Sequence, residues 1–90
     1  MPDEGRLRGE IRRRTELIRG LQSNISDAQS RISRAQAERA RPTAKPGDEY
    51  RRNGEIDKQI ADLTRGVEGS RREIGRLEVE IRGLENELRR

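Results

Sequence analysis

The chain of 90 residues contains no cysteine and no histidine, and Tyr50 is its one aromatic residue. Without cysteine it has no disulfide, no thiol nucleophile and no zinc–thiolate cluster. Without histidine it has neither a Ser-His-Asp triad nor an imidazole metal ligand. A phosphate-binding loop of the GxxxxGK[ST] kind is missing as well. We therefore predict a protein that is not an enzyme and binds no cofactor, metal or small molecule.

Apolar residues are also scarce, because only 28% of the chain is hydrophobic whereas 42% is charged. A globular core needs more apolar side chains than this. Two classes remain: a disordered chain, or an elongated helical coiled coil. No apolar run approaches the length of a membrane span, and no signal peptide opens the chain. We expect a cytoplasmic protein, or one carried inside a virus particle.

The apolar residues that are present recur with a period near 3.5, which favours the coiled coil. In the first half, the a and d positions of the heptads hold Leu7, Ile11, Ile18, Leu21, Ile25, Ala28, Ile32 and Ala35. In the second half they hold Ile56, Ile60, Leu63, Val67, Ile74, Leu77, Ile81, Leu84 and Leu88. The polar residues at these positions are Arg14, Asn53 and Ser70. Together these residues form the predicted seam of a left-handed coiled coil.

Two prolines separate the two halves. Pro42 disfavours helix at Arg41, and Pro46 with Gly47 should not continue a helix. Asp48 is a good N-cap residue. We predict one domain over 1–90, with helix one over about 3–41, a turn over about 42–47 and helix two over about 48–90.

A turn of this length is a normal connection between neighbouring helices. Folding the chain back about residue 44 pairs each a position with a d position, as antiparallel packing requires. Ile18 then meets Ser70, and Ala28 meets Ile60. We predict an all-α fold, an antiparallel coiled-coil hairpin that self-associates. The alternative is an open rod of two independent helices that forms longer oligomers.

Charge supports the hairpin over a parallel dimer of the second helix. In that dimer Glu73 would face Glu78, and Glu80 would face Glu85, which is unfavourable. In the hairpin, Arg14 extends from the seam to Glu73 or Glu78, with its stem buried and its guanidinium in water.

A single seam offers little burial for a chain of this size. Glycines inside the helices weaken it further, at about 0.5–1 kcal/mol each relative to alanine. We therefore expect the hairpin to bind itself or another helical protein. Leu17 and Val79 lie off the seam and are candidates for a second interface, although two exposed apolar residues are also ordinary on a protein surface.

Two short basic clusters, "RRR" at 12–14 and "YRR" at 50–52, are candidates for phosphate contact through Arg12, Arg13, Arg51 and Arg52. The alternative is that they are solvated helix faces, since the first cluster has acidic residues on both sides and no aromatic residue beside it to stack bases. We expect Tyr50 to cover the end of the hairpin over Ala35.

The layout resembles the N-terminal coiled-coil hairpins of viral nucleoproteins such as those of hantaviruses. "LRGEIRRR" opens in a similar rhythm, and "PGDEYRR" falls where such hairpins turn. It also resembles small helical-hairpin accessory proteins of bacterial secretion systems. Both resemblances cover the layout and no specific motif.

The principal hypothesis is a non-enzymatic coiled-coil module for oligomerisation or protein–protein interaction. The alternatives are a nucleic-acid-associated structural protein, and an accessory or chaperone hairpin of a secretion system.

Overall fold

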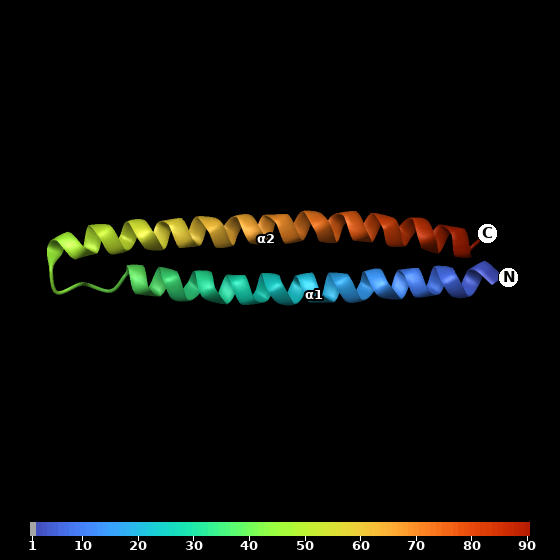
Figure 1. Ribbon diagram of the computed structural model, residues 1–90, viewed down its shortest axis with the longest axis horizontal. Helices are drawn as coiled ribbons and strands as arrows, with labels where there is room; N and C mark the ends of the chain where they lie inside the picture. Colours follow the sequence, from blue (N-terminus) through green and yellow to red (C-terminus); the bar gives the residue numbers. More distant parts are fainter. Residues whose placement is uncertain (1) are drawn as a thin grey trace.

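Two long helices lie side by side and antiparallel (Figure 1), in a computed structural model that describes residues 2–90. Helix α1 runs over Pro2–Arg39 and helix α2 over Pro46–Leu88. The molecule is a rod of 71 × 14 × 13 Å with both chain ends at the same end. All contacts between secondary-structure elements in the described chain join these two helices. The expected all-α helical hairpin is confirmed.

The turn differs from the prediction at both of its edges. Helix α1 ends at Arg39 rather than near Arg41, and α2 begins at Pro46. The predicted N-cap, Asp48, is wrong: Lys45 is the N-cap, in an extended conformation with φ −123° and ψ 127°. Proline suits the first position of a helix, because its missing N–H would be unpaired there anyway and its φ is already helical. The residue before a proline is pushed towards extended backbone, which places the boundary at Lys45.

The predicted register of the two helices is wrong by about one heptad. It placed Arg14 opposite Ile74, but the Arg14 Nε donates to Glu80 Oε1 over 2.8 Å. Near the loop, Arg39 donates from Nε and Nη2 to the two carboxylate oxygens of Asp57 over 2.7 and 3.2 Å. The same register would have placed Arg39 opposite Glu49. A shift of a whole heptad keeps a positions against d positions, so the seam survives with different partners.

The shape of the connection explains this shift. In Figure 1 the segment 40–45 continues past the end of α1 before α2 begins, so the first turns of α2 overhang α1. An extended residue advances the chain by up to about 3.3–3.6 Å, against 1.5 Å in a helix. The prediction assumed a compact turn about residue 44, whereas an extended connection displaces α2 outward along the rod.

Arg52 ties the connection to both helices. Its Nη2 donates to the carbonyl oxygen of Arg39 over 3.2 Å and to that of Arg41. These carbonyls lie at and just beyond the end of α1, where intrahelical donors run out. Thr43 is half-buried in the same connection, and its hydroxyl donates to the Lys45 carbonyl over 2.9 Å. Arg52 thus acts as a C-terminal cap delivered from the other helix.

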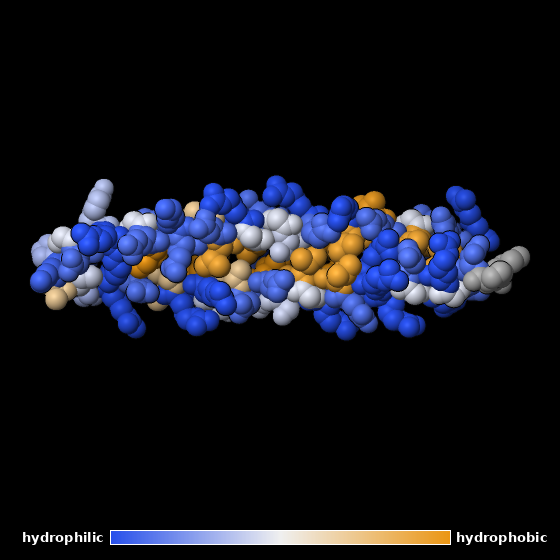
Figure 2. Space-filling view, in the orientation of Figure 1, coloured by the Kyte–Doolittle hydropathy of each residue, from blue (hydrophilic) through white to orange (hydrophobic). Residues whose placement is uncertain are grey.

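Every predicted seam residue is buried or half-buried. The most buried are Leu7, Ala35, Ile56, Val67 and Leu77, with exposed fractions between 4% and 8%. Yet no side chain in the described part of the chain is buried completely. On the face drawn in Figure 2, apolar atoms remain visible along the line between the two helices, flanked by hydrophilic side chains. In a two-helix hairpin, each seam is covered only by the facing helix, so both flanks of the seam stay open to solvent.

Candidate interaction surface

The seam has two halves of different composition. In the terminal half, near the chain ends, the d positions of α1 hold Leu7, Arg14 and Leu21. In the loop half, the next two d positions hold only Ala28 and Ala35. Alanine reaches less far toward the partner helix than leucine does. The loop half therefore has room beside its seam.

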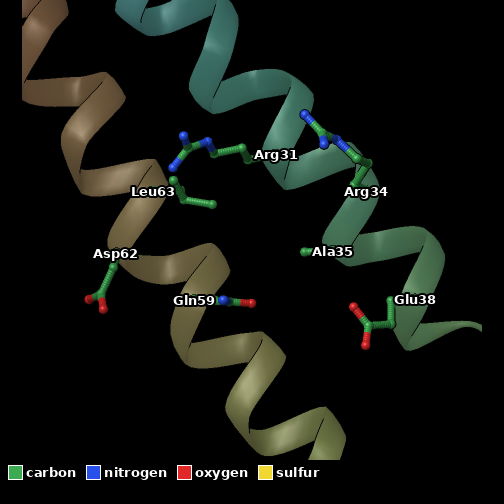
Figure 3. A pocket seen from close by; sticks show the side chains of 7 residues that line it. All are labelled: Arg31, Arg34, Ala35, Glu38, Gln59, Asp62 and Leu63. Carbon is green, nitrogen blue, oxygen red and sulfur yellow. The ribbon is translucent and has the colours of Figure 1, made fainter.

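This room takes the form of two hollows along one flank. One has a volume of about 400 Å³ and is lined by Arg31, Arg34, Ala35, Glu38, Gln59, Asp62 and Leu63 (Figure 3). The other has a volume of about 280 Å³ and is lined by Asn24, Ala28, Asp62, Leu63, Gly66, Val67 and Ser70. Because Asp62 and Leu63 line both, the hollows form one continuous depression, which we call the loop-half groove.

The loop-half groove has an apolar floor and charged rims. Ala28, Ala35, Leu63 and Val67 are seam residues and form the floor. The α1 rim carries Arg31, Arg34 and Glu38 and has a net positive charge, while the α2 rim carries Asp62. Figure 3 shows Arg31 reaching toward Leu63, and Asp62 turned away from α1. The two rims thus carry opposite charge.

Neighbours on the same helix partly neutralise these rim charges. The Arg31 Nε lies 3.5 Å from Asp27 Oδ2, one helical turn away. Asp62 pairs with Arg65 on its own helix. All four side chains are more than 60% exposed, and such pairs contribute roughly 0–1 kcal/mol each. They can exchange partners at little cost.

In the terminal half, a half-buried arginine bridges the two helices on the same flank, and a further hollow of about 440 Å³ lies beyond it at the chain ends, beside Leu7 and Leu88. Arg14 donates from Nε to Glu80, and from Nη1 to the Glu10 carboxylate over 3.2 Å and to the Glu10 carbonyl over 3.1 Å. The hydrogen bond to Glu80 raises the pKa of Arg14 above its ordinary value. The expectation that Arg14 reaches Glu73 or Glu78 is wrong, because the register shift brings Glu80 to its height. One guanidinium thus bridges two carboxylates that would otherwise repel each other.

The structure does not bring the two arginine clusters together. Arg12 and Arg13 are exposed near the chain ends, whereas Arg51 and Arg52 lie near the loop. The register separates the clusters by roughly 45 Å along the rod at 1.5 Å per residue. Arg13 is 4.0 Å from Glu10, and Arg52 is occupied with the carbonyls of the connection. Phosphate contact by these residues stays a prediction, with two separate clusters rather than one patch.

The remaining predicted surface residues are exposed. Leu17 is 53% exposed and Val79 is 62% exposed, at nearly the same height along the rod. Their role as a second interface stays a prediction. Tyr50 is 88% exposed, so the expectation that it covers Ala35 is wrong. It lies in the part of α2 that overhangs α1, beyond the reach of Ala35.

Sequence reasoning missed the loop-half groove, although a signal for it was present. Two consecutive alanines at d positions of α1, with Ser70 at a seam position of α2, mark a segment where the seam is underfilled. The register shift then brings these small residues to the same part of the rod. In the predicted register Ala28 was matched with the larger Ile60, which hid the hollow.

Fold and groove together define an antiparallel α-helical hairpin with one open flank. Within residues 2–90, no cluster of three or more acidic side chains is arranged to hold a metal ion. Neither helix has a segment long and apolar enough to cross a membrane, as far as the described residues extend. Comparison with protein-family models, curated protein sequences and solved structures finds no match for this chain.

Proposed function

We propose that this chain is a non-enzymatic protein–protein interaction module that self-associates by completing its coiled-coil seam. The observation that carries the proposal is that no side chain of the seam is completely buried and that the loop-half groove runs along one of its flanks. The Ile and Leu side chains supply the driving force by leaving water. The charged rims select the orientation of the partner.

The size of the solvent-exposed surface also supports this proposal. The hairpin exposes 7188 Å² at a mass of 10.4 kDa. A compact monomer of that mass exposes about 5,400 Å². A standard interface buries about 800 Å² on each partner. The excess surface is therefore larger than one interface needs, and a rod-like hairpin gains burial most readily by packing alongside another rod.

The glycines support it as well. All nine lie in α1 or α2, none has a positive φ, and a Cβ added at any of them meets no atom within 4 Å. No turn and no close approach inside the hairpin requires them. Each one in a helix interior costs about 0.5–1 kcal/mol relative to alanine. The hairpin alone thus bears a penalty of several kcal/mol, which association would offset.

Sedimentation equilibrium over a wide concentration range, with helicity followed by circular dichroism, tests the proposal. We expect one discrete oligomer that loses helix on dilution. A folded monomer at every concentration would contradict self-association.

Two further measurements address the alternatives. Binding to duplex or single-stranded nucleic acid at about 50 mM salt, with a steep loss at higher salt, would favour the nucleic-acid hypothesis. A stoichiometric complex with one cognate protein would favour the accessory or chaperone hypothesis.

A further inference from the structure

We propose that a second copy of this chain covers the loop-half groove, with both hairpins side by side and their loops at the same end. In this arrangement α1 of each copy packs on α2 of the other, related by a two-fold axis parallel to the rod. The inference rests on the self-association proposed above and specifies its surface and orientation.

The choice of flank follows from the hollows. The flank with the groove carries Asn24 and Arg31 on α1, and Gln59 and Gly66 on α2. Small residues there (Ala28, Gly66 and Ser70) leave the half-buried floor residue Leu63 accessible to an approaching side chain. Gly66 has open space where a Cβ would project. A second helix can therefore approach the apolar floor closely.

The choice of orientation follows from the rims. With the two-fold axis parallel to the rod, the Arg31 and Arg34 rim of each copy lies against Asp62 of the other, so the favourable contact occurs twice. Glu38 then lies near the uncharged Gln59. With the loops at opposite ends, α1 would pack on α1, and Arg31 would meet its own counterpart. Like charges placed together oppose that arrangement.

A charge exchange between two chains tests the surface. One variant carries Arg31→Glu and Arg34→Glu, and the other carries Asp62→Arg. Each variant alone brings like charges together at both symmetric contacts. We expect each to need about tenfold more protein than the unmodified chain to associate. An equal mixture restores opposite charges at both contacts, and we expect it to form a one-to-one complex at the unmodified affinity.

Disulfide trapping tests the orientation. Asp27 and Gly69 lie at nearly the same height on the outer edges of the two rims, so a chain with Asp27→Cys mixed with a chain with Gly69→Cys should form a mixed disulfide dimer. Ser33→Cys with Ala61→Cys is the matched pair on the opposite flank, and it should remain uncrosslinked. Arg31→Cys alone should not form a disulfide dimer either, because that product requires α1 against α1.

The outcomes separate this inference from the function on which it rests. If the unmodified chain is monomeric at every concentration, the proposed function itself fails. If it associates but the mixture of charge variants gains nothing, the groove is not the contact surface. If the opposite-flank pair crosslinks instead, the copies meet on the other side. If Arg31→Cys crosslinks with itself, the orientation is wrong.

Discussion

The terminal half and the loop half of this hairpin share one heptad pattern but differ in what they leave open. Near the chain ends, the d positions of α1 hold Leu7, Leu21 and Arg14, and Arg14 joins Glu10 and Glu80 across the seam. Near the loop, Ala28 and Ala35 take the d positions, and a groove runs along one flank. Both halves contain buried seam residues, so the halves differ in how the flank of the seam is filled, and the groove in the loop half is where we propose that a partner packs.

The largest expected effect comes from truncating two seam leucines, one in each half of the hairpin. Leu77 in the terminal half is 4% exposed, whereas Leu63 in the loop half is only half-buried. Leu77→Ala should lower the free energy of unfolding by about 2–5 kcal/mol. Leu63→Ala should cost less in the dilute hairpin, roughly 1–2 kcal/mol, because less apolar surface leaves the protein interior. Urea unfolding at one low protein concentration measures both.

The reverse order at low concentration would contradict the division into two halves. Sedimentation of the same two variants measures their self-association and so tests the difference between the two halves further. Leu63→Ala should weaken association more than its small effect on the dilute hairpin implies, because the groove floor is where the partner is proposed to pack.

The second prediction concerns the connection. Arg52→Ala removes the side chain that caps α1 through the carbonyls of Arg39 and Arg41, and it should cost about 1–2 kcal/mol. Arg51→Ala is the matched control, because Arg51 is exposed and adjacent, and it should stay within about 0.5 kcal/mol of the unmodified chain. Chemical unfolding gives both values. Equal effects would show that the cap contributes nothing beyond a surface arginine.

The connection also shows where sequence reasoning succeeds and where it stops. Heptad spacing suffices to predict two helices, their antiparallel pairing and the seam, because a period of 3.5 on two long segments admits few arrangements. The register is different, since shifts of one heptad keep every a position against a d position. It depends on the path of the connection 40–45 and on Arg52, and neither feature leaves a periodic signal. The groove depends on the register, so it was missed with it.

The third prediction compares two glycines. Gly66 lines the loop-half groove, whereas Gly75 lies outside it, and a Cβ at either position meets open space. Gly66→Ala and Gly75→Ala should each stabilise the dilute hairpin by about 0.5–1 kcal/mol through helix propensity. Only Gly66→Ala should also weaken association, because its methyl group occupies the surface offered to the partner. Thermal unfolding and sedimentation of both variants measure the two effects separately. An identical effect of both variants on association would remove Gly66 from the interface.

The smallest expected effect concerns the ion pair that joins the two helices near the loop. Arg39 binds Asp57 near the loop, and this hydrogen bond lowers the pKa of Asp57 below its ordinary value of 3.8. A carboxylate with a depressed folded-state pKa contributes stability above its unfolded pKa and loses it as the pH falls through the folded value. Arg39→Gln removes the cause of the shift. Unfolding free energies of the two chains should therefore differ at pH 6 and converge below the folded pKa of Asp57. The pair is exposed, so the difference should be small and should shrink with salt.

A difference in unfolding free energy that persists at low pH would mean that Arg39 stabilises the hairpin through the packing of its stem rather than through its charge. The loop half would then, like the terminal half, be held by apolar contact.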